Sequence, residues 1–232
     1  MDEKSIKQRL IMALCVAFMW IMFVLFLGSI AQASQPKFCS VEYFEQHELP
    51  TNHPNTKRLR CYQIGELKLC YMAVGSSKSD PYEMASLSPA PESEKYCTWY
   101  FNSGDELKQS MFNHVHLRGP YDSWWPTVSR EDIANDYERQ LNPQLPSMLK
   151  CVEKFNYKGG GCNGQRHRGP SEMAWFLSVA GCSPEISERI AFHNFHLNGV
   201  KRSTRVAIAR RGYELGHKYP EYRRRFQKVM GN

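Results

Sequence analysis

The chain has 232 residues, a net charge of +7 and 42% hydrophobic residues. Without its first 33 residues it is long enough for one large or two small domains that each hold a core. It contains no internal repeat and no heptad run, which excludes a repeat array and a coiled coil.

The positive charge is concentrated in the C-terminal half of the chain. Residues 34–127 carry 9 basic and 11 acidic side chains, whereas residues 128–232 carry 18 basic and 10 acidic ones. Such an asymmetry indicates an anionic partner for the C-terminal half, and solubility alone is the alternative explanation.

The N-terminal segment predicts export. Residues 10–27 are all apolar and follow Lys4, Lys7 and Arg9. The leading positive charge favours transfer of the downstream chain across a membrane. A helix of this length reaches roughly 27 Å, slightly less than a hydrocarbon core of roughly 30 Å. Ala31-Gln32-Ala33 resembles a signal-peptidase site, so residues 1–33 are either a cleaved signal peptide or a retained membrane anchor.

The exported part contains seven cysteines, which in an oxidising compartment predict disulfide bonds. Because the number is odd, one thiol is left over. No Asn-x-Ser/Thr sequon occurs after residue 33, which favours a bacterial envelope over a eukaryotic secretory route.

A β-hairpin is the clearest local prediction. Residues 58–64 and 67–73 are strand-like, and Gly65-Glu66 between them suits a two-residue turn. This turn pairs Cys61 with Cys70 at a position without hydrogen bonds, where Cα atoms approach to about 4.5 Å. We therefore predict a Cys61–Cys70 disulfide, with Cys39 or Cys97 as alternative partners.

The rest of residues 34–127 predicts a small antiparallel sheet with long loops. Residues 34–57 and 74–94 are expected to be irregular, and residues 95–102 and 113–117 to be strands. An aromatic connector at 121–126 would close this disulfide-braced, β-rich domain.

Residues 128–232 predict a second, basic and all-helical domain. A capping-box pattern at Ser129 begins a helix that ends near residue 141. Further helices are expected at 147–155, 171–180, 184–197, 204–217 and 221–228, and the one at 171–180 is apolar enough to be the centre. The predicted fold class is α+β, with the β-rich part first.

A glycine-rich basic loop is expected at residues 157–169. Residues 159–164 match the dinucleotide fingerprint by letter, but no βαβ pattern surrounds them, so we reject that interpretation. Lys158, Arg166 and Arg168 precede a predicted helix start, where backbone N–H groups favour an anion. A flexible connector is the alternative.

The C-terminal tail is the strongest indication of function. Arginine outnumbers lysine there, and its planar guanidinium suits phosphate and carboxylate groups. The predicted anion-binding residues in this tail are Arg210, Arg211, Arg223, Arg224 and Arg225.

Other residues suggest chemistry only weakly. The pairs His114/His116 and His193/His196 could each supply two zinc ligands, and Cys162 near His167 could be a nucleophile. The glutamates to inspect for glycan hydrolysis are Glu138, Glu153 and Glu172. We expect no metal site and no cofactor.

Together these patterns predict an exported envelope or secreted protein, either anchored through residues 10–27 or released. Its helical half would bind an anionic surface or polymer such as phospholipid, a cell-wall polymer or nucleic acid, and a protein partner is also open. The alternative is a secreted hydrolase, either a glutamate-dependent wall glycosidase or a metal-dependent phosphodiesterase using the paired histidines. The sequence identifies no reaction.

Overall fold

The computed structural model describes residues 12, 18–20, 35–51, 59–74, 80–102, 110–117, 128–164, 167–193 and 201–232. The chain divides into two units, Met1–Gln35 and Pro36–Asn232. Residues 12 and 18–20 of the first unit are helical and exposed. The predicted apolar segment 10–27 lies mostly outside the described residues, and within the described part no helix has the length and apolar character needed to cross a membrane.

The second unit contains a sheet that has six strands among the described residues. In sheet order these are β1 (Glu48–Leu49), β2 (Leu59–Ile64), β3 (Leu67–Ala73), β6 (Tyr157–Cys162), β4 (Thr98–Asn102) and β5 (Asn113–His116). Strands β1, β2 and β3 are antiparallel, whereas β3, β6, β4 and β5 run parallel. The expected antiparallel sheet is therefore a mixed one.

The β2–β3 hairpin has the predicted register. Ile64 pairs with Leu67 and Cys61 with Cys70, as a two-residue turn at Gly65-Glu66 requires. The Cys61–Cys70 disulfide is present, with Cα atoms 4.1 Å apart. Gly65 has a φ of +58°, which glycine adopts without steric cost.

Strand β6 overturns the prediction of a glycine-rich loop at residues 157–169. Its residues pair with both β3 and β4, so a strand from the helical half occupies the middle of the sheet. A Cβ atom on Gly160 would lie 2.5 Å from the ring of Tyr71, so the strand needs glycine where this ring covers it. The expected domain boundary near residue 127 consequently lies inside one compact unit.

The helices of the second unit are α2 (Val41–Gln46), α3 (Asp80–Ser86), η1 (Glu92–Cys97), α4 (Arg130–Leu141), η2 (Asn142–Gln144), α5 (Leu145–Phe155), α6 (Arg168–Val179), α7 (Pro184–His193), α8 (Arg202–Lys218) and α9 (Pro220–Val229). The predicted capping box at Ser129 is present at the start of α4. Helices α2, α3 and η1 correct the prediction that residues 34–57 and 74–94 are irregular, because these segments bury Phe44 and Met84.

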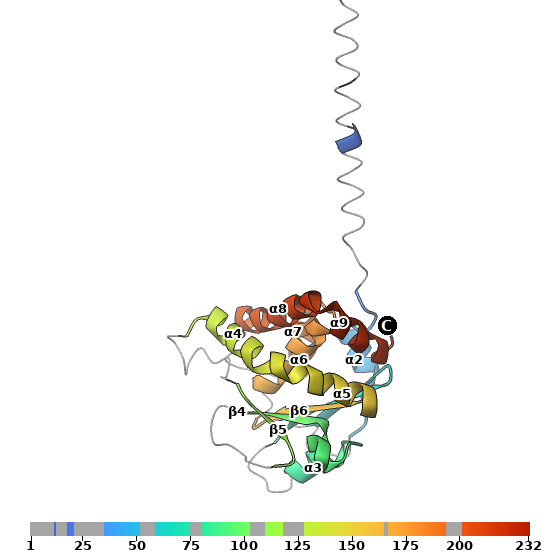
Figure 1. Cartoon of the computed structure of the whole chain (residues 1–232), viewed down its shortest axis with the longest axis vertical. Coiled ribbons are helices and arrows are strands. Elements are labelled where there is room, and N and C mark those ends of the chain that lie inside the picture. Colours follow the sequence, from blue (N-terminus) through green and yellow to red (C-terminus); the bar gives the residue numbers. More distant parts are fainter. Residues whose placement is uncertain are drawn as a thin grey trace, which may run out of the picture. The chain divides into compact units, whose positions relative to one another are not determined.

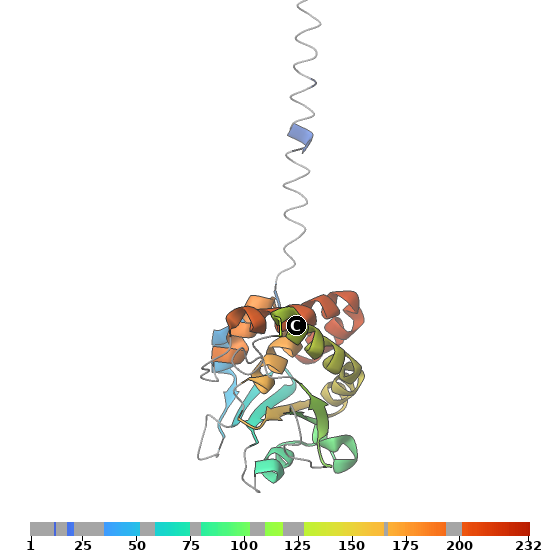
Figure 2. The ribbon, with the colours of Figure 1, turned by 90° about the vertical axis from the view of Figure 1, so that its left-hand side faces the viewer.

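Helices α4 to α9 form a layer on one side of the sheet, whereas α3 lies on the other side (Figures 1 and 2). Helix α6 is the centre of the helical layer, because every residue from Arg168 to Val179 is buried. This confirms the apolar helix predicted at 171–180. The fold is α+β, with most strands early in the chain and a helical C-terminal part.

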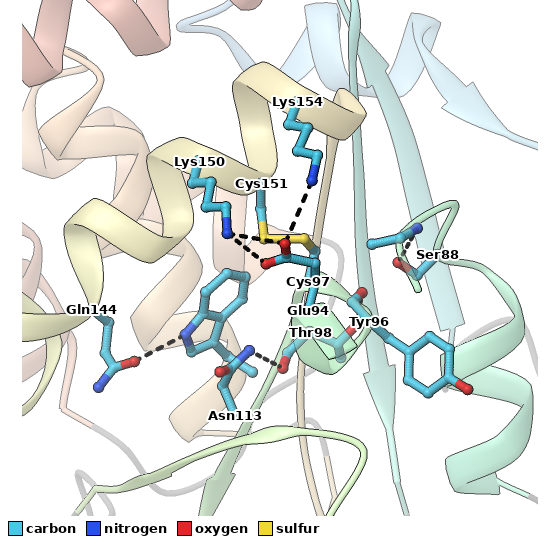
Figure 3. The surroundings of a disulfide bond; sticks show 12 residues. Ser88, Glu94, Tyr96, Cys97, Thr98, Asn113, Gln144, Lys150, Cys151 and Lys154 are labelled. Atoms are coloured by element: carbon cyan, nitrogen blue, oxygen red, sulfur yellow. Dashed lines mark hydrogen bonds and ion pairs between the residues drawn. A yellow bond between two sulfur atoms is a disulfide. The ribbon is translucent and has the colours of Figure 1, made fainter. Parts of the chain in front are cut away.

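Two further disulfides connect distant segments. Cys39–Cys182 connects the start of the unit to the segment between α6 and α7, and Cys97–Cys151 joins η1 to α5. Figure 3 shows the second of these. The three disulfides indicate an oxidising compartment and agree with export. Cys162 takes part in none of them and is buried.

A left-handed stretch of backbone lies beside the Cys97–Cys151 disulfide. Lys95, Tyr96 and Cys97 have φ values of 45°, 51° and 50°. For side chains other than glycine this conformation costs roughly 1–2 kcal/mol per residue. The turn therefore depends on its contacts with α5 for its position.

Candidate functional site

The candidate site is a shallow groove on the outer face of α8, with a volume of about 500 Å³. Helix α8 lies directly against α6, because Gly212 and Gly216 let it approach the carbonyl oxygens of Trp175 and Val179. This close approach leaves the opposite face of α8 to solvent. The basic residues that line the groove are Arg130, Arg202, Arg210 and Arg211.

Three of the four arginines of the groove are accessible to a ligand, whereas Arg211 is half-buried. The side chains of Arg130, Arg202 and Arg210 are 61%, 59% and 60% exposed. Val206 and Ala207 also line the groove and give it an apolar part. Planar guanidinium groups beside a small apolar surface suit an anionic polymer that also carries carbon-rich groups.

Carboxylates of α4, α7 and α8 lie next to these arginines. Arg210 is 3.7 Å from Glu185 of α7, and Arg211 is 3.0 Å from Glu214 of α8 and 3.4 Å from Glu131 of α4. The exposed Arg210–Glu185 pair contributes about 0–1 kcal/mol, and Glu131 and Glu214 are each about half exposed beside Arg211. An anion of high charge density can therefore displace these carboxylates at low cost.

A buried carboxylate fixes α8 beneath the groove. Glu188 of α7 is 3% exposed and accepts hydrogen bonds from Arg202 and Arg205 at 3.2 Å and 2.8 Å. The guanidinium of Arg205 also lies 4.4 Å from the ring centroid of Phe192. The sequence analysis missed Glu188, because nothing in the local pattern distinguishes it from the exposed Glu185.

The three consecutive arginines of α9 do not form one patch. Arg225 makes two hydrogen bonds to Glu153 of α5, at 2.7 Å and 2.6 Å. Arg223 donates to His217 Nε2 at 3.1 Å and lies over Gly181. Arg224 is exposed, and no described residue forms an ion pair with it. Successive helical residues point in directions about 100° apart, which separates these three side chains.

Two of the three residues predicted to bind an anion at 157–169 are buried. Lys158 is fully buried between the sheet and α6, and Arg168 is 4% exposed. Arg166 lies outside the described residues. A solvent anion cannot reach Lys158, which faces inward because β6 is a central strand rather than a loop.

Lys158 instead belongs to a buried polar cluster. Its Nζ donates to Tyr71 Oη at 2.9 Å and to Glu172 Oε2 at 3.1 Å, and Tyr71 Oη donates to the same oxygen at 2.5 Å. The Nζ atom also lies within 5.6 Å of the ring centroids of Tyr71, Trp99 and Phe176. Aromatic rings and one carboxylate thus replace water around this ammonium group.

Burial shifts the pKa values of Lys158 and Tyr71 in this cluster. Desolvation lowers the pKa of Lys158, while the carboxylate of Glu172 acts in the opposite direction. Desolvation and the nearby Glu172 both raise the pKa of Tyr71 well above its usual range. Tyr71 therefore stays protonated and acts as a hydrogen-bond donor to Glu172.

The residues considered for hydrolysis do not converge. Glu138 lies 3.7 Å from Arg211, Glu153 pairs with Arg225, and Glu172 is in the core. His193 contacts Glu45 at 2.9 Å, and His196 lies outside the described residues. Among the described side chains no group of three or more potential ligands could hold a metal ion.

We compared the chain with protein-family models, curated proteins and solved structures, and none of them matches it.

Proposed function

We propose that this chain is an exported, disulfide-braced protein that binds an anionic surface or polymer through the arginine-lined groove of α8. The observation that carries the proposal is the presence of four arginines around one hollow of about 500 Å³, three of them more than half exposed. The apolar run at residues 10–27 supports delivery to the periplasm or the cell exterior, where the protein is either anchored or released.

Charge reversal in the groove tests this proposal. We expect Arg130→Glu/Arg210→Glu to abolish binding of the full chain to a polyanionic polymer such as heparin. The same variant should abolish the preference of the full chain for phosphatidylglycerol vesicles over neutral phosphatidylcholine vesicles, which the apolar segment 10–27 does not distinguish by charge. The matched control is Lys37→Glu/Arg189→Glu, which makes the same change in net charge at two exposed positions for which the described residues offer no ion-pair partner.

Salt provides a second, independent measurement. Binding through several cations must weaken steeply as ionic strength rises, because counterions screen the arginines. Equal binding by the groove variant and its control, or binding that does not respond to salt, would show that the α8 groove is not the anion site. Vesicles and heparin measured side by side show which class of anion binds more tightly.

A further inference from the structure

A second groove lies between α5 and α9, and two of the lysines that line it form ion pairs with Glu94, a carboxylate at its edge. Its volume is about 430 Å³, and Pro146, Leu149 and Tyr222 give it an apolar wall. Its basic residues are Lys150, Lys154 and Arg225. Apart from Arg225, these residues belong neither to the α8 groove nor to the predicted basic tail.

The three cations of this groove are not equivalent. Arg225 holds Glu153 with both hydrogen bonds of its planar fork and is therefore satisfied within the groove. Lys150 and Lys154 instead lie on either side of Glu94 (Figure 3). Lys150 donates to both oxygens of Glu94 at 2.9 Å, and Lys154 Nζ is 3.5 Å from one of them.

These lysines remain accessible while they hold Glu94. Their side chains are 57% and 56% exposed, whereas Glu94 is 22% exposed. The hydrogen bond from Lys150 lowers the pKa of Glu94, so this carboxylate stays ionised near neutral pH. An anion from solvent therefore meets the ammonium groups of Lys150 and Lys154, which share the single carboxylate of Glu94 as their ion-pair partner.

The backbone that presents Glu94 is unusual. Glu94 directly precedes the left-handed residues Lys95, Tyr96 and Cys97, and the disulfide Cys97–Cys151 ties this turn to α5 one residue after Lys150. Residues in 3₁₀ helices and in extended strands have negative φ values, so this turn is neither of these regular structures. Backbone held in such a conformation is typical of sites where a side chain must be kept in one place.

We propose that a phosphate monoester carried on an apolar or aromatic group binds Lys150 and Lys154 at the edge of the α5–α9 groove, and that Glu94 takes the place of the phosphate beside these lysines when no ligand is bound. A phosphate monoester has close to two negative charges and three acceptor oxygens, so it competes well with one carboxylate for Lys150 and Lys154. Its organic part would pack on Tyr222, Pro146 and Leu149. This inference does not depend on the α8 groove.

The test measures binding of phenyl phosphate and of inorganic phosphate to the full chain by isothermal titration. We expect Glu94→Gln to bind phenyl phosphate about three- to tenfold more tightly than the unaltered chain, because two exposed ion pairs no longer compete. Glu92→Gln is the matched control, since Glu92 is exposed in the same short helix and pairs with no described cation. Inorganic phosphate should bind more weakly than phenyl phosphate.

Removal of the lysines completes the test. Glu94→Gln with Lys150→Met/Lys154→Met should lose phenyl phosphate binding, whereas Arg130→Glu/Arg210→Glu should retain it. Equal affinity of the Glu94→Gln and Glu92→Gln chains, binding without the lysines, or no binding by Glu94→Gln would each overturn the proposal. Lysine acetylation gives a readout on the unaltered chain: phenyl phosphate should protect Lys150 and Lys154, and unchanged acetylation would contradict the site.

Discussion

Replacement of Lys158 by methionine should strongly destabilise the protein. The substitution removes an ammonium group that lies 3.1 Å from each oxygen of Glu172 and 2.9 Å from Tyr71 Oη. Glu172 is fully buried, so its carboxylate would keep only the hydrogen bond from Tyr71. Breaking a buried ion pair from one side costs about 3–5 kcal/mol of unfolding free energy. For a unit of this size, that loss lowers Tm by roughly 6–20 °C.

Urea unfolding followed by circular dichroism measures the loss, with Lys150→Met as the matched control. Lys150 also pairs with a glutamate, but its side chain is 57% exposed, so its removal should cost less than about 1 kcal/mol. Joint replacement by Lys158→Met, Glu172→Met and Tyr71→Phe should recover most of the stability, because no polar group then remains unsatisfied. A cost for Lys158→Met no larger than that for Lys150→Met would refute the reasoning.

Three further measurements follow from the structure. A disulfide stabilises a protein mainly by reducing the entropy of the unfolded chain, and the effect grows with the length of the closed loop. Cys39→Ser/Cys182→Ser opens a loop with a sequence separation of 143 and should lower the unfolding free energy by about 5 kcal/mol, whereas Cys61→Ser/Cys70→Ser opens one of 9 and should lower it by about 2.6 kcal/mol. Equal losses in a urea titration would contradict this argument. Arg205→Ala leaves the buried carboxylate of Glu188 paired with Arg202 but not with Arg205 and should cost about 2–4 kcal/mol, whereas Arg210→Ala should cost less than about 1 kcal/mol. A larger loss for Arg210→Ala in thermal unfolding would contradict the role of Glu188 in fixing α8. Burial raises the pKa of four tyrosines above the ordinary value of 10.0, so above pH 10 these side chains lose their protons in the unfolded chain but not in the folded one. Each tyrosine therefore lowers the unfolding free energy by about 1.4 kcal/mol per pH unit above pH 10. Ultraviolet absorbance should show that the four tyrosines ionise together with unfolding and not before it. These tyrosines are Tyr62, Tyr71, Tyr137 and Tyr157.

Local patterns sufficed to predict the elements whose geometry is set by neighbouring residues. The hairpin register followed from a two-residue turn, and the start of α4 followed from the Ser129 capping box. Both depend on hydrogen bonds between residues that are close in sequence. The helix at the centre of the helical layer was likewise visible from its apolar residues.

Strand β6 was missed because tertiary contacts decide its conformation. Three glycines in succession have no strand propensity and no alternation of apolar side chains. The strand forms because β3 and β4 supply hydrogen bonds on both sides, and because the ring of Tyr71 needs the space at Gly160. The same error placed Lys158 on the surface, so the Lys158–Glu172 pair could not be anticipated.

Some of the excess basic side chains of the C-terminal half form ion pairs with carboxylates that are distant in the sequence. Counted along the chain, the tail has few acidic neighbours, yet Arg211 meets Glu131 from α4 and Arg225 meets Glu153 from α5. Charge counts therefore overestimate the number of cations that are available to a ligand. They do not remove the case for anion binding, because an exposed ion pair contributes little and a ligand with several charges can replace its carboxylate. Both proposed ligands must therefore displace internal carboxylates, which is why removal of Glu94 should strengthen binding at the α5–α9 groove. Arg130→Glu/Arg210→Glu should abolish binding at the α8 groove for a different reason, because it replaces two of the ligand's cations by carboxylates.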